Sequence, residues 1–386
     1  MIPRLLQSEL LTQLTEYPVV TVIGPRQAGK TTLVKAALPD YTYVSLENPE
    51  TRQLAIEDPK AFLQRYPGKV IFDEIQRTPD LLSYLQEIVD QRGQNGQFVL
   101  TGSHQLQLRE AITQSLAGRT GVLHLLPLSM AELDAADIRF SGPEAYIFQG
   151  FMPRVYDQRQ RPHTAYANYY QTYVERDVRQ LIRLKDVLLF EKFIKLLAGR
   201  VGQIINYQSL ASDVGVDGKT IKQWLSILEA SYVVFSLPPY FENFGKRAIK
   251  SPKYYFTDTG LLCYLLGIEK VEQVFRDPLM GHLFENMVVL EALKARYNQG
   301  RAAELYFYRD SQGNEIDVLH RSGGTLMGIE IKAGSTWHSS FKKNLSTFSE
   351  KRTMLARRVI VYSGQTFQMS DGLEALSYRQ TASLFV

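Results

Sequence analysis

The sequence has very little cysteine and no long uninterrupted run of apolar residues. Its single cysteine, Cys263, excludes an intrachain disulfide and a metal site built from several cysteines. No apolar stretch has the length needed to cross a bilayer, and the first residues, MIPRLLQSELL, lack the long apolar core of a signal peptide. We therefore expect a cytoplasmic protein that does not enter a membrane.

The sequence also lacks a strong excess of charge of either sign. The net charge is +4 over 386 residues, which permits a nucleic-acid partner without arguing for one. Hydrophobic residues make up 45% and charged residues 22%, a composition that is typical of globular proteins. A chain of this length is expected to form two or three domains.

The most informative stretch is residues 19–34, VVTVIGPRQAGKTTLV. The apolar run Val19–Ile23 predicts a strand, and a helix is predicted to follow from Gly29, so the pattern GxxxxGK[ST] has the strand–loop–helix setting that it requires. Loop amides and a helix N-terminus form a positive cradle for phosphate. The predicted nucleotide-binding residues are Gly24, Pro25, Arg26, Gln27, Ala28, Gly29, Lys30, Thr31 and Thr32.

Two of these residues have individual roles in this motif. Lys30 is expected to reach the β and γ phosphates, and the Thr31 hydroxyl is expected to ligate Mg²⁺. The alternative is a chance glycine-rich turn before a helix. The preceding strand, both glycines, the Lys-Thr pair and an acidic strand further along the chain favour the nucleotide site.

That acidic strand is GKVIFDEIQ, where an apolar run over 69–72 ends in Asp73 and Glu74. The carboxyl end of a parallel strand faces the crevice in which such sheets bind ligands. Asp73 is therefore expected to hold Mg²⁺, and Glu74 to orient and deprotonate the attacking water. An acidic pair can also simply end a strand, but a position 43 residues after Lys30 is less common for such a pair.

Polar residues also follow the next predicted strand, over 97–100. A small hydroxyl at this strand end is suited to sensing the γ-phosphate or the attacking water. We assign that role to Ser103, with Thr101 as the alternative. Ser103 is equally suited to capping a helix N-terminus, since serine is favoured there.

Arg119 follows Ser103 by 16 residues and precedes the last predicted strand of this region, over 122–125. In oligomeric ring ATPases an arginine at such a position contacts the γ-phosphate bound to a neighbouring subunit. The alternative is a structural arginine that pairs with a carboxylate at the sheet edge. Only the first interpretation requires an oligomer.

Several of these segments together resemble the AAA+-type ATPase module of many bacterial and archaeal proteins that carry a C-terminal domain of unknown function: GPRQAGKTTL, VIFDEIQ, FVLTGS, and SLAGR with LPLSMAE. The resemblance extends through YVERDVRQL and covers most of the chain. It implies ATP and Mg²⁺ as cofactors, ATP hydrolysis and a homo-oligomer. The residues at matching positions are Lys30, Thr31, Asp73, Glu74, Ser103 and Arg119.

The middle of the chain predicts helices and then a helix–turn–helix. Tyr166–Leu184 and Val187–Ala198 are expected to be helices that form a lid next to the nucleotide. A short helix over Tyr207–Val214, a glycine-containing turn, a helix over Lys219–Ala230 and a strand over Tyr232–Leu237 follow the layout of a winged helix–turn–helix.

Nucleic-acid contact by this module would need exposed polar and basic residues near the start of its second helix. Lys219, Lys222, Gln223 and Ser226 are expected to face outward there. Basic residues in the wing-like stretch that follows add to the surface: Lys246, Arg247, Lys250 and Lys253. The alternative is a module used for packing or for protein contact.

The C-terminal region predicts a helix over Phe284–Ala295 and then three strands, over 304–309, 315–319 and 326–331. Its polar residues Glu285, Asp317, Glu330 and Lys332 have a D…ExK spacing that resembles the PD-(D/E)xK nuclease family. The resemblance implies that the carboxylates hold Mg²⁺ against a scissile phosphate and that Lys332 positions or activates water. Alternatively, Glu330 and Lys332 are a charged pair on an exposed strand face, or the domain is an inactive nucleic-acid binder.

We therefore expect three α/β or helical parts: a P-loop ATPase domain over 1–160 with a parallel sheet, a helical lid and winged helix over 161–253, and a nuclease-like α/β domain over 254–386. The predicted function is ATP hydrolysis coupled to the binding or processing of DNA or another nucleic acid. The alternative is a nucleotide-dependent switch or scaffold for protein partners, with an inactive C-terminal domain. A helicase or translocase ranks lower because no further helicase-like motifs are present.

Overall fold

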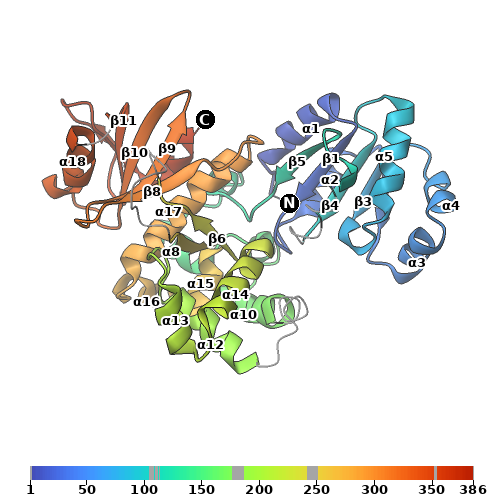
Figure 1. Cartoon of the computed structure of the whole chain (residues 1–386). Coiled ribbons are helices and arrows are strands. Elements are labelled where there is room, and N and C mark those ends of the chain that lie inside the picture. The colour runs from blue at the N-terminus through green and yellow to red at the C-terminus, as the bar shows by residue number, and fades with distance from the viewer. Residues whose placement is uncertain are drawn as a thin grey trace. The chain divides into compact units, whose positions relative to one another are not determined.

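The computed structural model describes residues 2–385 apart from 104–107, 109–111, 113, 176–186, 241–250 and 352–353. The chain forms two compact units (Figure 1). The first comprises Met1–Leu128 with the short segments Ala230–Tyr232 and Tyr297–Arg301, and the second comprises the remaining residues. Among the described residues, no helix is both long and apolar enough to cross a membrane.

The first unit is built on a five-stranded sheet in the order β2-β3-β4-β1-β5, in which every neighbouring pair is parallel. Its strands are β1 (Val19–Ile23), β2 (Thr42–Ser45), β3 (Val70–Asp73), β4 (Phe98–Gly102) and β5 (Thr120–His124). Its helices are α1 (Leu6–Glu16), α2 (Lys30–Ala37), α3 (Pro49–Glu57), α4 (Pro59–Gln64), the short η1 (Ile75–Arg77) and α5 (Leu81–Arg92). The parallel α/β sheet predicted from the sequence is confirmed.

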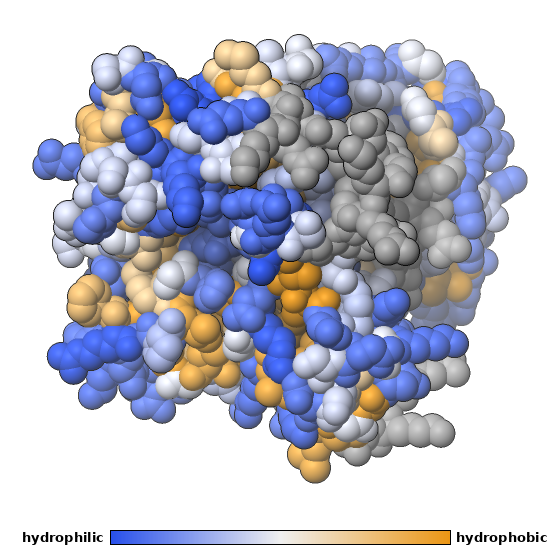
Figure 2. All heavy atoms as spheres, turned by 60° about the vertical axis from the view of Figure 1, so that its left-hand side comes forward, coloured by the Kyte–Doolittle hydropathy of each residue, from blue (hydrophilic) through white to orange (hydrophobic). Residues whose placement is uncertain are grey.

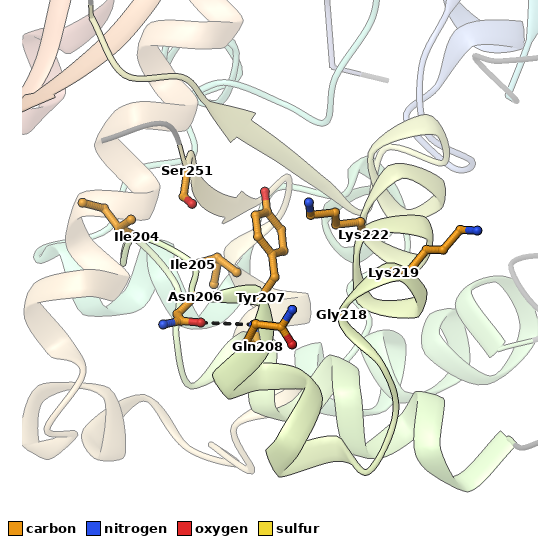
Figure 3. Close-up of a pocket in the computed structure, with 9 residues that line it drawn as sticks. All are labelled: Ile204, Ile205, Asn206, Tyr207, Gln208, Gly218, Lys219, Lys222 and Ser251. Carbon is orange, nitrogen blue, oxygen red and sulfur yellow. Dashed lines mark hydrogen bonds between the residues drawn. The ribbon is translucent and has the colours of Figure 1, made fainter. Parts of the chain in front are cut away.

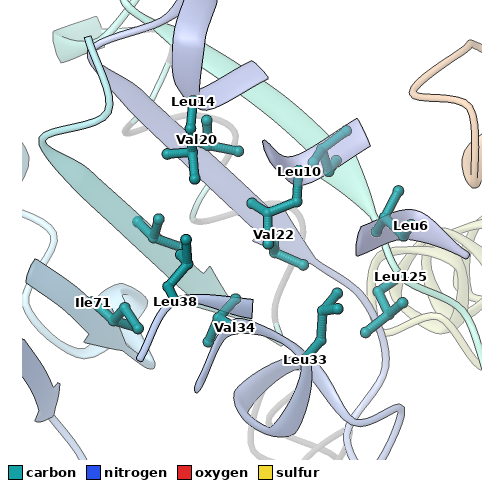
Figure 4. Packing of buried hydrophobic residues seen from close by; sticks show 12 residues of the cluster. Leu6, Leu10, Leu14, Val20, Val22, Leu33, Val34, Leu38, Ile71 and Leu125 are labelled. Carbon is teal, nitrogen blue, oxygen red and sulfur yellow. The ribbon is translucent and has the colours of Figure 1, made fainter. Parts of the chain in front are cut away.

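The three central strands, β1, β3 and β4, are buried throughout. Because side chains alternate along each strand, these strands contribute to a core on both faces of the sheet. On one face, Val20 and Val22 of β1 pack against apolar residues of α1 and α2 (Figure 4). The leucines of α1 that reach this core are four residues apart, as one face of a helix requires: Leu6, Leu10 and Leu14. On the other face, the rings of Phe72 and Phe98 stack with their centroids 6.0 Å apart.

The second unit begins with helices and a two-stranded antiparallel sheet. Its first helices are α7 (Met130–Ala135), α8 (Pro143–Gln149), α9 (Pro153–Asp157), α10 (Pro162–Tyr169), the π-helical η2 (Tyr170–Glu175), α12 (Val187–Ala198), α13 (Tyr207–Val214) and α14 (Gly218–Ala230). Strands β6 (Val234–Leu237) and β7 (Lys253–Phe256) pair with each other. They are followed by α15 (Thr259–Leu265), α16 (Val271–Arg276) and α17 (Met280–Tyr297).

A six-stranded mixed sheet completes this unit, in the order β12-β13-β11-β10-β9-β8. Its strands are β8 (Leu305–Arg309), β9 (Glu315–Ser322), β10 (Thr325–Lys332), β11 (Arg357–Tyr362), β12 (Phe367–Gln368) and β13 (Glu374–Ser377), with η3 (Ser339–Lys342), α18 (Lys343–Lys351) and η4 (Tyr378–Phe385) beside them in sequence. The first unit is thus followed by a second sheet of a different kind.

Two features differ from the sequence-based expectation. The predicted helix over 166–184 begins earlier, at Pro162, and changes to π-helical geometry at Tyr170; residues 176–186 lie outside the described part. Lys253 was expected on a basic wing, but it is only 2% exposed, because β7 carries its side chain into a cluster of carboxylates. The other wing residues, Lys246, Arg247 and Lys250, lie outside the described residues.

The described surface is chemically mixed. On the face drawn in Figure 2, hydrophobic side chains occur in separate groups among hydrophilic ones. Large apolar side chains that are mostly exposed lie on different elements: Leu188 in α12, Phe275 in α16 and Met354 before β11. Isolated exposed apolar residues are normal on protein surfaces and indicate no specific contact.

Candidate functional site

The phosphate loop connects β1 to α2 and has a backbone that needs its glycines. Gly29 has φ 90°, in the left-handed region that glycine adopts at little cost. A Cβ atom on Gly24 would lie 2.0 Å from the carbonyl oxygen of Leu125, so no side chain fits there. Gln27 is also left-handed, with φ 62°, and its side chain is exposed. This loop therefore makes a tight turn of the kind expected of a phosphate site.

Lys30 is buried against this loop. Its ammonium donates hydrogen bonds to the carbonyl oxygens of Gly24, at 2.9 Å, and Pro25, at 2.8 Å. Burial lowers the pKa of Lys30 to about 8, although the nearby carboxylates of Glu74 and Asp73 act in the opposite direction. A bound phosphate would offer this ammonium a charged partner in place of two neutral carbonyls.

Asp73 is the last residue of β3 and is surrounded by hydroxyl groups. The Thr31 hydroxyl lies 3.1 Å from each of its carboxylate oxygens, and the Tyr43 hydroxyl donates to Oδ2 at 2.7 Å. Thr101, on the strand between β1 and β3, donates to Oδ1. A threonine hydroxyl and a carboxylate this close are oxygen ligands of the kind that Mg²⁺ prefers, so these residues fit the ion.

Glu74 follows in a strained backbone conformation, with φ 60° and ψ 46°. Its Oε2 accepts hydrogen bonds from the Ser103 hydroxyl, at 3.1 Å, and from the amide of Gln76. Gly102 permits this arrangement, because a Cβ there would lie 2.8 Å from the Gln76 side-chain oxygen. Strain at a non-glycine residue is typical of functional sites, where surrounding contacts hold the geometry.

The remaining predicted residues of this site have different surroundings. Thr32 is exposed in the first turn of α2, and Arg26 is half-buried in the loop. Arg119 pairs with Asp90 of α5 through Nε, at 2.6 Å, and Nη2, at 2.9 Å. It directly precedes β5, at the amino end of the parallel sheet, whereas the phosphate loop follows the carboxyl end of β1. The structure therefore does not bring Arg119 to the nucleotide site of its own chain.

Three residues of this site were missed by sequence reasoning. Tyr43 and Gln76 bind the two carboxylates described above. Arg4 donates to the carbonyl oxygens of Ala28, at 2.5 Å, and Leu126, at 2.6 Å, and so connects the start of the chain to the phosphate loop. Tyr43 lies within β2, the strand next to β3, which is a usable signal, but nothing in the local sequence around Arg4 indicates this contact.

A cavity of about 600 Å³ lies at the start of α13 and α14, the two helices of the predicted helix–turn–helix (Figure 3). Lys222 is directed toward Tyr207, with its ammonium 5.1 Å from the ring centroid, whereas Lys219 points away from that ring. Both lysines are exposed, as are Gln223 and Ser226, whereas four apolar residues of α14 are buried: Ile221, Trp224, Leu225 and Leu228. This surface is a candidate nucleic-acid interface.

The C-terminal site residues lie together in the second unit. The Lys332 ammonium is 2.7 Å from Glu330 Oε2 and 3.9 Å from Asp317 Oδ2. Burial raises the pKa of Asp317 well above its usual range, and the carboxylates of Glu330 and Glu285 raise it further. Glu285, on α17, is held by Lys253 at 3.1 Å. The structure thus assembles all four predicted residues but adds a second lysine.

These C-terminal residues do not fit the predicted Mg²⁺. Among the described residues, no group of three or more histidine, cysteine, aspartate or glutamate side chains is arranged to hold a metal ion. Lysine ammonium groups lie against the carboxylates instead. One buried carboxylate oxygen, Oε1 of Glu330, accepts no hydrogen bond. Cleavage of nucleic acid by this domain stays a prediction.

Comparison with protein families agrees with the fold and the site geometry of the first unit. The AAA domain family matches residues 16–134, where the phosphate loop, Asp73 and Glu74 lie. Two domains of unknown function match the rest of the chain, DUF8612 over residues 142–272 and DUF4143 over residues 280–380. Sheet topology, site geometry and this match together define an AAA-type ATPase with a P-loop NTPase fold in its first unit.

The chain is 34% identical over 376 residues to the uncharacterized protein Rv2008c of Mycobacterium tuberculosis, covering 96% of this chain and 82% of that protein. The uncharacterized protein Mb2031c of Mycobacterium bovis matches to the same extent. An uncharacterized protein of Haemophilus influenzae is 25% identical over 359 residues, covering 83% of this chain and 84% of that one. This chain belongs to the family of these mycobacterial proteins.

Among solved structures, a Walker-type ATPase of Pyrococcus abyssi matches 69% of this chain and 96% of its own, with 15% identity and a TM-score of 0.46. The AMPPCP-bound DnaA of Aquifex aeolicus matches 58% of this chain and 85% of its own, with 12% identity and a TM-score of 0.30.

Proposed function

We propose that this chain binds ATP with Mg²⁺ at the phosphate loop and hydrolyses the bond to the γ-phosphate. The observation that supports this most directly is the 3.1 Å contact between Thr31 and Asp73, with Glu74 as the next residue. The loop that contains Lys30 joins β1 to α2, so phosphate and metal ligands come from adjacent parts of one sheet edge.

Each residue has a distinct task in this proposal. Lys30 binds the β and γ phosphates, and Thr31 and Asp73 hold Mg²⁺, which neutralises charge on the phosphates. Glu74 accepts a proton from the attacking water. Ser103 holds Glu74 in position through its hydrogen bond to Oε2 and senses the γ-phosphate. Mg²⁺ supplies the electrostatic stabilisation, and the protein residues supply orientation and proton transfer.

Replacing Glu74 by Gln tests this proposal. The variant keeps the size of the side chain but removes the base, so we expect ATP to bind while turnover falls by at least about a hundredfold. A matched control is Glu50→Gln on α3, an exposed glutamate, which should hydrolyse ATP at the unchanged rate. If Glu74→Gln hydrolyses ATP as fast as the unaltered protein, Glu74 is not the base.

We further propose that turnover is coupled to nucleic-acid contact through α14. Support comes from the exposed Lys219 and Lys222 and from the cavity between the helices. Arg119 acting on the nucleotide of a neighbouring subunit in a homo-oligomer belongs to the same proposal; its side chain is 34% exposed. Measuring the ATPase rate and the molecular mass in solution, with and without DNA, tests both parts.

A second candidate is a nucleotide-dependent switch for protein partners. One observation favours it: Lys30 and Glu74 are both held by hydrogen bonds from the chain itself, which a bound nucleotide would have to exchange. Under this alternative, Glu74→Gln would keep the biological output while losing turnover, whereas the coupled ATPase would lose both.

A further inference from the structure

Lys253 occupies the centre of the acidic cluster in the second unit. It lies on β7, in the hairpin that follows the helix–turn–helix, and no part of the D…ExK pattern includes it. Its ammonium is 3.1 Å from Glu285 Oε1 and 2.5 Å from Glu315 Oε1, and the side chain is 3% exposed. One lysine therefore bridges carboxylates from α17 and β9.

Oε1 of Glu285 already has two partners in the protein, whereas Oε2 faces a histidine beyond hydrogen-bond distance. Besides Lys253, the Tyr255 hydroxyl donates to Oε1 at 2.5 Å, and His282 Nδ1 lies 3.7 Å from Oε2. Burial by itself raises the pKa of Glu285, but Lys253, His282 and Tyr255 together outweigh this effect, and the pKa is held at about 2. Glu285 is thus an ionised carboxylate whose counter-ion is a lysine.

The other half of the cluster contains a second ammonium group, that of Lys332. Lys332 contacts Glu330 and Asp317, and Asp317 Oδ2 also accepts a hydrogen bond from the Ile331 amide at 2.7 Å. Four carboxylates therefore share two ammonium groups. A divalent cation that used these carboxylates would have to displace Lys253 or Lys332 from short ion pairs.

The same contacts join β7 to α17 and to the large sheet. Lys253 and Tyr255 of β7 bind Glu285, and the side chain of Asn286 exchanges two hydrogen bonds with the main chain of Phe256, at 2.8 and 2.9 Å. Removing one partner of a buried ion pair leaves an uncompensated charge, which is strongly destabilising. These contacts therefore hold β7 against α17, and the Lys253–Glu315 ion pair joins it to β9 of the C-terminal sheet.

We propose that Lys253 is the resident cation of this cluster, and that the C-terminal sheet is a metal-independent module that is joined to the hairpin by ion pairs and does not cleave nucleic acid. This goes beyond the ATPase activity, on which it does not depend. In this proposal the Lys253 ammonium occupies the position between carboxylates where a metal-dependent site would hold its divalent cation.

Thermal unfolding with and without millimolar Mn²⁺ tests this proposal. The full chain should carry Asp73→Asn, so that the phosphate-loop site adds no metal response. We expect Mn²⁺ to leave the unfolding midpoint unchanged. In a further Lys253→Ala variant we expect a midpoint lower by several degrees and partly restored by Mn²⁺, because the ion can fill the place of the ammonium. Adding Glu285→Gln to Lys253→Ala should abolish this rescue.

Two results would overturn the proposal. One is an unfolding midpoint that rises by several degrees with Mn²⁺ while Lys253 is present, if this rise is lost in Glu330→Gln. Glu330 is the residue to change because its Oε1 is the buried carboxylate oxygen of this cluster that is still able to accept a cation. The other is metal-dependent cutting of plasmid DNA that Asp317→Ala abolishes. If Lys253→Ala does not fold, these two measurements decide the question without it, and Lys253→Arg, which keeps the charge, should fold without responding to Mn²⁺.

Discussion

The ammonium of Lys30 lies 2.8 Å from the carbonyl oxygen of Pro25, five residues earlier in the phosphate loop. The lysine that is expected to bind nucleotide is thus bonded to its own loop and shielded from water. In the proposed function, a bound nucleotide replaces these carbonyl contacts with contacts to phosphate oxygens. The protonation state of Lys30 therefore affects affinity.

Nucleotide affinity should fall at alkaline pH. The pKa of Lys30 is about 8 without nucleotide, and phosphate oxygens raise it when they bind. Affinity is then constant below that pH and decreases above it, by about tenfold between pH 7 and pH 9. Titration with a fluorescent ATP analogue at both pH values measures this change. Lys30→Gln should bind weakly at both, and an unaltered protein with equal affinities would contradict the prediction.

The lowered pKa of Lys30 has the opposite effect on folding stability, which should rise with pH. The unfolded chain keeps the ordinary lysine pKa of about 10.5, so between pH 8 and pH 10.5 the unfolded state binds more protons than the folded state. The free-energy cost of burying the charged Lys30 ammonium is fully present below pH 8. It is lost as the pH rises from 8 to 10.5, so the free energy of unfolding increases over this interval.

Arg4 should be needed for an ordered phosphate loop. Arg4→Ala removes two hydrogen bonds to main-chain oxygens, on Ala28 and Leu126, and should lower the free energy of unfolding by about 1–3 kcal/mol. Nucleotide affinity should fall several-fold because the loop loses its support. Denaturant unfolding and nucleotide titration measure the two effects. Arg65→Ala, an exposed arginine, is the control and should change neither.

Gly24 should tolerate no side chain. Gly24→Ala places a Cβ 2.0 Å from the Leu125 carbonyl oxygen, which has to move, and we expect a loss of about 2–3 kcal/mol of stability. At Gly68 nothing lies within 4 Å of the same added atom, so Gly68→Ala should stay within about 1 kcal/mol of the unaltered protein. Equal midpoints for the two variants in denaturant unfolding would show that the loop relaxes without cost.

Asp90 allows the proposed role of Arg119 to be separated from its structural one. If Arg119 acts on the nucleotide of a neighbouring subunit, Arg119→Ala should lower turnover by about a thousandfold or more. Asp90→Asn removes the carboxylate partner but keeps the arginine, and should leave turnover nearly unchanged. ATPase rates measured at a concentration where the protein is oligomeric distinguish these variants. Equally small effects would assign Arg119 to the ion pair alone.

The lysines of α14 should contribute to nucleic-acid affinity through charge. Lys219→Ala combined with Lys222→Ala should reduce the slope of log affinity against log salt concentration by about 2, one for each lost phosphate contact. Fluorescence anisotropy with duplex DNA at several salt concentrations measures the slope. Lys60→Ala, an exposed lysine of the first unit, should not change it. Unchanged slopes in both variants would remove α14 from the interface.

Much of the candidate nucleotide site could be predicted from the sequence alone, because the residues of its motifs lie close together in the chain. A glycine-rich loop between an apolar strand and a helix specifies its own geometry, and the structure places Asp73 at the end of the next buried strand as predicted. Gly24 shows the limit of this local information. The sequence predicts it as part of the phosphate loop, but the group that a side chain there would meet is the carbonyl oxygen of Leu125, about a hundred residues away.

In the C-terminal region the sequence correctly predicted which residues gather but not what surrounds them. Asp317, Glu330 and Lys332 meet because adjacent strands bring them together. Lys253 was assigned to an exposed wing because its neighbours in sequence are basic. Its actual partners, Glu285 and Glu315, come from a helix and a strand 32 and 62 residues further on.

The sequence by itself determined the order of the elements, the phosphate loop and the acidic strand end, since these depend on periodicity and short-range spacing. Only the tertiary structure decided that Arg4 supports the loop, that Arg119 pairs with Asp90, and that Lys253 pairs with Glu285 and Glu315. The physical reason is that ion pairs and main-chain contacts between distant segments form where packing brings the groups together, and no local pattern records which groups will meet.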